Sequence, residues 1–264
     1  MASGKITSQK WNIGMSVTFE TKVWEKDYEI ILKSGRIQKM IDRCHYPFDQ
    51  KKLFINNVND LGKVQKLADK LVSQSVIDEY VVVDHFAKEA LAFFDLSKEA
   101  LGKGYYYSIA ELVSIYLCST TYLLHFSGDS IPMRNSNYKW LHLLIKKLES
   151  NPQICVANLL WNQKTEEAIQ ESIEHDPQFC IGYGFSDQMY LIRTDEFRRS
   201  IFNEVNEKSN HYPSYGGELF EKRVHSYMLN HERFRATYLG TSYKHRNFSK
   251  KAWVRRLNQL FDWH

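Results

Sequence analysis

The chain has 264 residues, 43% of them hydrophobic and 25% charged, with a formal net charge of +4. This composition supports a buried core and excludes a largely disordered protein. The positive excess is too small to indicate nucleic-acid binding, and no apolar run reaches the ~18 residues that a membrane helix needs. The first residues, MASGKITSQKWNIG, lack the apolar stretch of a signal peptide. We therefore expect a cytoplasmic protein.

The cysteines and histidines show no metal-binding pattern. No two cysteines form a C-x-x-C pair, and no histidines have H-x-x-x-H spacing. Each cysteine lies in or beside an apolar segment, which predicts buried thiols rather than a disulfide framework or zinc ligands. The four are Cys44, Cys118, Cys155 and Cys180.

Strand-like and helix-like segments alternate through the first half of the chain. Strand patterns cover residues 13–19, 53–58, 80–86 and 121–126, and helical spacing of apolar residues covers 37–44, 64–72 and 106–118. This alternation predicts parallel strands joined by helical crossovers. Such sheets bind ligands at the carboxyl ends of their strands. The predicted strand ends are Thr18–Glu20, Asn56–Asp60, Asp84–His85 and Ser127–Ser130.

The second half is less regular. Residues 140–148 and 218–229 have helical patterns, 154–160 and 188–193 have strand patterns, and 212–217 form a predicted loop. No internal repeat, low-complexity segment or linker is visible, so we expect one domain over residues 1–264. We divide it into residues 11–130, residues 131–248 and a C-terminal amphipathic helix over 249–264.

The strongest local signal is the turn Ser127-Gly128-Asp129-Ser130, which directly follows the fourth predicted strand. Gly128 permits a tight turn, and Asp129 places a carboxylate just past the strand end. Mg²⁺ and Mn²⁺ prefer oxygen ligands and are often shared between a carboxylate and substrate phosphates. The same tetrapeptide is also ordinary turn chemistry, but its position after a buried parallel strand favours a functional role.

The order of elements and this motif resemble the GT-A glycosyltransferases, over Trp11 to Phe248. The resemblance implies an α/β fold with a mostly parallel central sheet flanked by helices, in which residues 11–130 form the nucleotide-sugar-binding half and residues 131–248 the acceptor half. It also implies that Asp129 holds Mn²⁺ or Mg²⁺ against a donor diphosphate, beside Ser127 and Gly128. In that family the motif is often Asp-x-Asp, and Ser127 stands here where the first Asp is usual.

The resemblance further implies a nucleoside site at the first strand end, with Thr18 and Glu20. Asn57 and Asp84, which follow the next two strands, can hydrogen-bond a base edge or a ribose hydroxyl. Asn and Asp are also common loop residues, so the cluster carries more weight than any one member.

A late basic segment, Gly240 to Phe248, contains Lys244, His245 and Arg246. GT-A enzymes often contribute a late histidine or basic residues to the metal or the diphosphate. The resemblance therefore implies that His245 is a metal ligand and that Lys244 and Arg246 bind phosphate. The ordinary alternative is a surface histidine.

Ser214 to Met228 resembles the acceptor-side segment of inverting family 2 enzymes, in which an acidic residue begins a helix after an aromatic-glycine loop. Inversion needs a base for the proton of the acceptor hydroxyl, and the resemblance implies Glu218. The alternative is a helix-capping acid. Asp187, which precedes the predicted strand at 188–193, is the rival base.

The predicted function is transfer of a sugar from a UDP-, GDP- or dTDP-sugar to a hydroxyl of a glycan or lipid-linked acceptor. A sugar nucleotidyltransferase is one alternative, although Thr18 to Asp27 contains no glycine for a triphosphate loop. A non-catalytic carbohydrate-binding protein with a degenerate site is another. No G-x-G-x-x-G or G-x-S-x-G motif supports a dinucleotide-dependent oxidoreductase or a serine hydrolase.

The predicted C-terminal helix has an apolar stripe and a basic face. The stripe contains Trp253, Val254, Leu257, Leu260 and Phe261. Such a helix can lie on an anionic membrane surface, or it can pack on the core of its own domain. Packing is the commoner outcome, and a peripheral membrane contact is the alternative.

Overall fold

The computed structural model describes residues 15–212, 218–246 and 248. Within them, ten strands form one sheet in the order β3-β2-β1-β4-β9-β6-β10-β8-β7, with β5 paired to β10. The strands are β1 (Val17–Val23), β2 (Gln50–Ile55), β3 (Glu79–Val82), β4 (Tyr122–Phe126), β5 (Ser130–Pro132), β6 (Ile154–Trp161), β7 (Ser172–His175), β8 (Phe179–Gly182), β9 (Met189–Arg193) and β10 (Phe234–His245).

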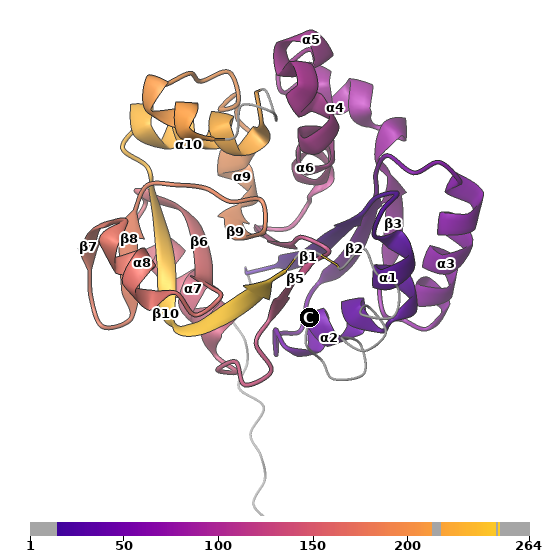
Figure 1. Ribbon diagram of the computed structural model, residues 1–264, viewed down its shortest axis with the longest axis horizontal. Coiled ribbons are helices and arrows are strands. Elements are labelled where there is room, and N and C mark those ends of the chain that lie inside the picture. The colour runs from indigo at the N-terminus through magenta and orange to yellow at the C-terminus, as the bar shows by residue number, and fades with distance from the viewer. Residues whose placement is uncertain (1–14, 213–217, 247, 249–264) are drawn as a thin grey trace, which may run out of the picture.

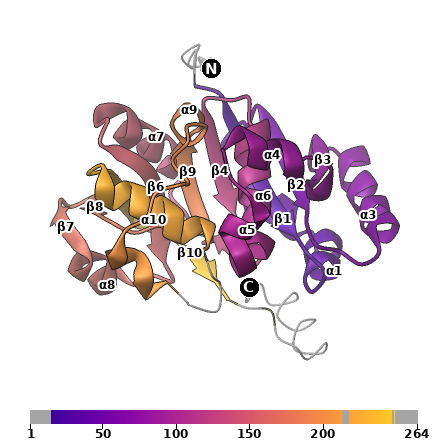
Figure 2. The same ribbon diagram turned by 90° about the horizontal axis from the view of Figure 1, so that it is seen from above.

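Helices cover both faces of this sheet (Figures 1 and 2). The α-helices are α1 (Tyr28–Lys33), α2 (Arg36–Asp42), α3 (Leu61–Ser73), α4 (Ala87–Phe93), α5 (Lys98–Leu101), α6 (Tyr105–Leu117), α7 (Trp140–Ser150), α8 (Thr165–Gln170), α9 (Thr194–Phe197) and α10 (Phe220–Asn230). Three short 3₁₀ helices are η1 (Val83–His85), η2 (Gly102–Gly104) and η3 (Glu207–His211). Buried residues of α1, α2, α3 and α7 share one core, and those of α4, α6 and α10 lie in clusters on the other side.

The expected α/β architecture with a central sheet between helices is confirmed, but the sheet is entirely parallel only in its first half, because the second half combines the parallel pair β6–β10 with antiparallel pairs. β3, β2, β1 and β4 pair in parallel, whereas β9 is antiparallel to both β4 and β6. β7 and β8 also pair antiparallel, because a short connection joins neighbouring strands and a parallel pair needs a crossover of about a dozen residues. The expected mostly parallel sheet therefore holds for the first half, whereas the second half is mixed.

The first strand begins and ends later than its apolar pattern predicted. It runs from Val17 to Val23, and its alternation places Phe19 in the core on one face and Glu20 and Lys22 on the other. The polar residues continue the strand because they bind each other there, with Lys22 Nζ 2.8 Å from Glu20 Oε1. The carboxyl end of β1 is therefore Val23 and not Thr18–Glu20.

Further predictions concern the cysteines, membrane-spanning helices and the segments at 212–217 and 249–264. The four cysteines are free and buried, as predicted. No helix in the described part of the chain has the length and apolar character needed to cross a membrane. The predicted helix over 249–264 and most of the loop at 212–217 lie outside the described residues.

The packing of α7 gives a first test of this architecture. Trp140 is fully buried, and its indole N–H donates to the Arg43 carbonyl at 3.2 Å. Trp140→Ala removes a large core side chain, so we expect a loss of about 3–5 kcal/mol in the free energy of unfolding, measured by urea denaturation. Tyr138→Ala, at a side chain that is 64% exposed, should change it by less than about 0.5 kcal/mol. Equal effects of the two substitutions would contradict the placement of α7.

Candidate active site

A cavity of about 350 Å³ lies at the carboxyl ends of β1, β2 and β4, where the parallel half of the sheet meets β9. Parallel sheets bind ligands at this edge. Its lining comes from the loops after these strands, from the start of α6, from the loop before β9 and from the end of β10. The residues are Lys22, Val23, Trp24, Asp27, Asn56, Asn57, Tyr106, Tyr107, Ala110, Glu111, His125, Ser127, Gly128, Asp129, Asp187, Gln188 and His245.

The predicted acidic turn forms the floor of this cavity, and Gly128 is required for its shape. A Cβ on Gly128 would collide with Ile31 Cδ1 and would lie 3.1 Å from the Lys22 carbonyl. The buried Arg36 side chain donates from Nε to the Gly128 carbonyl at 2.6 Å. The turn is therefore held tightly between β1 and the helices α1 and α2.

Asp129 and His245 meet at this floor from distant parts of the chain. His245 Nε2 lies 3.3 Å from Asp129 Oδ2, and the Ser127 hydroxyl donates to Asp129 Oδ1 at 2.9 Å. Burial opposes ionisation of Asp129, but these contacts outweigh it and lower the pKa of the carboxyl. Asp129 is therefore an ionised carboxylate beside an imidazole.

A second carboxyl group, Asp27, faces the same region. Burial is the main cause that raises the pKa of Asp27 to about 7, and the negative charge of Asp129 adds to it. Two carboxyl groups close enough to repel each other favour a cation between or beside them.

The residues fit a divalent cation that is shared with a phosphate rather than held by protein alone. Among the described residues, no three His, Cys, Asp or Glu side chains converge to hold a metal. Asp129 and His245 offer one oxygen and one nitrogen ligand, and the diphosphate and water would complete the shell. Such partial coordination by protein is usual for Mg²⁺ at phosphate sites.

Aromatic side chains form the opposite wall of the cavity. Trp24 and Tyr106 pack edge to face with ring centroids 6.3 Å apart, and Tyr106 and Tyr107 are 40% and 49% exposed. The Asn57 amide donates to the Tyr106 carbonyl at 3.0 Å, which ties the end of β2 to the start of α6. Exposed rings in a cleft offer a stacking surface for a flat ligand.

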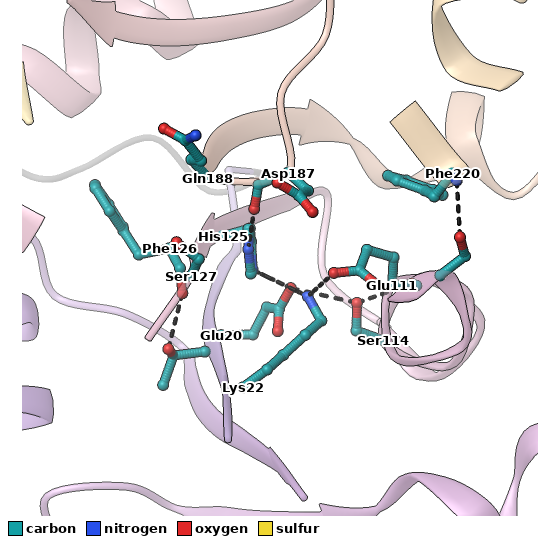
Figure 3. Close-up of polar contacts among 12 residues, drawn as sticks. Glu20, Lys22, Glu111, Ser114, His125, Phe126, Ser127, Asp187, Gln188 and Phe220 are labelled. Atoms are coloured by element: carbon teal, nitrogen blue, oxygen red, sulfur yellow. Dashed lines mark hydrogen bonds and ion pairs between the residues drawn. The ribbon is translucent and has the colours of Figure 1, made fainter. Parts of the chain in front are cut away.

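A group of charged side chains from β1, β4 and α6 forms part of the cavity wall (Figure 3). Lys22, Glu111 and His125 line the cavity, and Glu20 is fully buried. Lys22 Nζ contacts Glu20 Oε1 at 2.8 Å, His125 Nδ1 at 3.0 Å and Glu111 Oε1 at 3.4 Å. Burial opposes the charge of Glu20, but Lys22 and His125 lower its pKa to about 2. Burial raises the pKa of Glu111 to about 7, with help from the charges of Asp187 and Glu20.

Asp187 stands above this group, in the loop before β9 (Figure 3). His125 Nε2 donates to the Asp187 carbonyl at 2.7 Å, and the Asp187 N–H donates to Glu221 Oε1 at 2.7 Å. Both contacts fix the backbone, so the Asp187 side chain is presented to the cavity from a rigid position.

The structure brings about half of the predicted site residues together. Those that line the cavity are Asn57, Ser127, Gly128, Asp129, Asp187 and His245.

Three predicted nucleotide ligands from the first half lie elsewhere. Thr18 is buried in the first part of β1, where its hydroxyl lies 2.7 Å from Thr120 Oγ1. Glu20 is beneath the cavity and bound to Lys22. Asp84 is in η1 and lines a separate cavity with Tyr105. These three residues lie outside the cavity because β1 continues to Val23 and β3 ends in a helical turn.

Three predicted residues from the second half also do not line the cavity. The carboxylate of Glu218 lies 2.6 Å from Lys222 Nζ. Lys244 is exposed on β10, and Arg246 approaches the turn only through its backbone N–H, 3.4 Å from the Asp129 carbonyl. Lys22, Asp27, Glu111 and His125 were not predicted. The alternation of Glu20 and Lys22 with their neighbours is the one sequence signal that could have extended β1 and placed Lys22 near its carboxyl end.

A smaller cavity of about 250 Å³ adjoins the first across the loop before β9, since Gln188 lines both. Ser186 and Trp161 also line it, and Trp161 is 36% exposed. Its cations are paired with carboxylates, Lys164 with Glu167 at 2.6 Å and Arg235 with Glu171 at 3.4 Å.

The sequence matches no protein-family model and no curated protein. Its architecture is similar to that of glucosyl-3-phosphoglycerate synthase from Mycobacterium tuberculosis in complex with Mg²⁺ and uridine diphosphate, with 12% identity, a TM-score of 0.49, and coverage of 94% of this chain and 79% of that chain. It is also similar to the galactosyltransferase LgtC in complex with donor and acceptor sugar analogues, with 13% identity, a TM-score of 0.42, and coverage of 79% and 69%. At these identities the similarity is one of fold.

The raised pKa of Glu111 predicts a pH dependence of stability. The Glu111 carboxyl group has a pKa of about 7 in the folded protein, against an ordinary value of 4.5. Between these two pH values it is therefore more often protonated in the folded state than in the unfolded state. Its contribution to stability is therefore full below pH ~4.5 and is lost as the pH rises through about 7, on the order of 3 kcal/mol. Glu111→Gln should flatten the urea-derived free energy of unfolding between about pH 5 and about pH 7.5. Parallel curves for the two proteins would refute this.

Proposed function

We propose that this protein is a glycosyltransferase that moves a sugar from a nucleoside-diphosphate sugar to a hydroxyl acceptor with the help of a divalent cation. The observation that carries the proposal is the order of groups along the sheet edge. Asn57 and Trp24 follow β2 and β1, the Asp129 turn follows β4, and Asp187 precedes β9, which is the order of these strands in the sheet. Along this edge the stacking surface comes first, the cation ligands come next and the Asp187 carboxylate comes last. The base, the diphosphate and the sugar have the same order in such a donor.

The chain's own residues account for donor binding. The rings of Trp24, Tyr106 and Tyr107 stack the base, and Asp129 and His245 hold the cation. The bound cation would neutralise the diphosphate and stabilise the charge that develops on it as the leaving group. Asp27 lies near Asp129, so the repulsion between the two carboxylates is relieved when the cation binds.

Asp187 is our candidate for the catalytic carboxylate that contacts the sugar or the attacking hydroxyl. Of the two predicted bases, it is the one that lines the cavity, whereas Glu218 is bound to Lys222. The inverting course came from the resemblance of Ser214 to Met228 to inverting enzymes, and it stays a prediction. The adjoining cavity beyond Ser186 and Gln188 is the proposed acceptor site, since an acceptor there reaches the same loop.

The alternatives are weaker at this site. A sugar nucleotidyltransferase must hold a triphosphate, but the loop after β1 turns Asp27 into the cavity and binds its carboxylate to the Trp24 N–H at 2.8 Å. A non-catalytic carbohydrate-binding protein does not require cation ligands placed between a stacking surface and a carboxylate. The nucleotide, the acceptor, the cytoplasmic location and the membrane contact of residues 249–264 stay predictions.

Donor binding is tested by removing Asp129, one of the two proposed cation ligands. Asp129→Ala should abolish the Mn²⁺-dependent part of UDP, GDP or dTDP binding measured by calorimetry, a loss of roughly 10- to 100-fold in affinity. Asp84→Ala is the matched control, because that carboxylate lies in η1 outside the cavity, and it should bind as the native protein does. Unchanged Mn²⁺ stimulation in Asp129→Ala would remove this residue from the metal site.

Catalysis is tested by a pair of carboxylate-to-amide changes. Asp187→Asn keeps the shape and removes the charge, so kcat for sugar transfer should fall by about 10²-fold or more while UDP affinity stays within about twofold. Glu218→Gln should remain close to the native rate. The anomeric configuration of the product, read by NMR, then assigns the role: inversion identifies Asp187 as the base, and retention identifies it as a sugar-contacting residue. A larger loss in Glu218→Gln would reverse the assignment.

A further inference from the structure

Three carboxyl groups from three different elements converge at one side of the cavity, where Asp187 and Glu111 line it. Asp187 comes from the loop before β9, Glu111 from α6 and Glu221 from the first turn of α10. The Asp187 N–H donates to Glu221 Oε1 at 2.7 Å. The charges of both Asp187 and Glu111 act on Glu221. Figure 3 shows Asp187 close to Glu111 and Lys22 on the side of α6.

Positive charge is scarce in this group. Lys22 contacts Glu111 at 3.4 Å but is nearer to Glu20, at 2.8 Å. Within the described part of the chain, no lysine or arginine forms an ion pair with Asp187 or Glu221. Three ionised carboxylates with so little compensation would repel each other strongly, so one of them retains a proton.

The other groups that face Glu221 do not supply a cation. Tyr212, after η3, and Tyr243, on β10, both feel its charge, and burial is the main cause of their raised pKa values. Arg235 on β10 acts on these two tyrosines but pairs with Glu171. On α10 itself, Lys222 pairs with Glu218.

Glu221 is the member of the group that keeps the proton. Burial raises its pKa well above the ordinary value, and the charge of Asp187 and a side-chain hydrogen bond with Asp187 raise it further. Its position at the start of α10 favours the ionised form, but by less than burial and two neighbouring carboxylates oppose it. A neutral Glu221 has one O–H to donate and one oxygen that accepts.

We propose that Glu221 is a positioning residue, which accepts the Asp187 N–H and donates its own O–H to the Asp187 carboxylate, so that this carboxylate is held in one orientation at the cavity. The proposal rests on the proposed function, in which Asp187 acts on the sugar. Ionisation of Glu221 removes the donated hydrogen bond and adds a repulsive charge. Turnover therefore falls as the pH rises through the Glu221 transition.

The experiment compares Glu221→Gln with Glu221→Leu through the pH profile of kcat for UDP-sugar turnover. Glutamine reproduces both hydrogen bonds of the neutral acid, since its carbonyl accepts and its amide donates. Glu221→Gln should keep the native kcat near neutral pH and lose the alkaline decline. Glu221→Leu should lower kcat by roughly 10- to 100-fold at unchanged donor KM. Glu111→Gln, which keeps Glu221, should retain the decline.

A second readout does not depend on turnover. In protein labelled with ¹³C at the glutamate carboxyls, the Glu221 signal is identified by its loss in Glu221→Gln. Its titration should lie above the ordinary glutamate range and move down in Asp187→Asn. If no nucleotide sugar is turned over, the proposed function fails while this titration still tests the pair. An ordinary midpoint for Glu221, or an alkaline decline that persists in Glu221→Gln, would overturn the positioning role.

Discussion

The site depends on one buried cation, the ammonium group of Lys22. It contacts Glu20 on its own strand, His125 on β4 and Glu111 on α6, so a single charge joins two adjacent strands to the helix that covers them. Burying a charge is costly unless it is paired and hydrogen-bonded. Lys22 therefore fixes the spacing of three elements, and its carbonyl lies against Gly128 in the turn that carries Asp129.

The residues that line the cavity come together because the strand direction changes between β4 and β9. The parallel strands β2, β1 and β4 end at one edge, and the antiparallel β9 begins at that same edge. The loop that enters β9 therefore places Asp187 beside the strand ends, and β10 returns His245 to Asp129 from more than a hundred residues away in the chain. A donor that lies along this edge meets its stacking, cation-binding and carboxylate groups in order.

Carboxyl groups in this region differ in charge because their neighbours differ. Glu20 and Asp129 are ionised because a cation or an imidazole contacts each of them. Asp27 and Glu111 each have a pKa of about 7, mainly because of burial. Binding of a cation or a substrate near either of them changes that balance.

The sequence by itself determined the alternation of strands and helices in the first half and the turn at Ser127 to Ser130, which places Asp129 just past a strand end. These features depend on local periodicity and turn chemistry, which neighbouring residues encode. The metal role of Asp129 and the candidacy of His245 came from the resemblance to GT-A glycosyltransferases, and Asp187 was a candidate because it precedes a predicted strand. The tertiary structure alone decided the mixed second half of the sheet, the extent of β1 to Val23, and the roles of Lys22, Glu111 and Glu221. Lys22 inside β1 is stabilised by partners from β4 and α6, and Glu221 on α10 contacts Asp187 in the loop before β9, so in each case the partners are distant in sequence. The same reason separates Glu218 from Asp187, since which carboxylate faces the cavity depends on how α10 packs on the sheet.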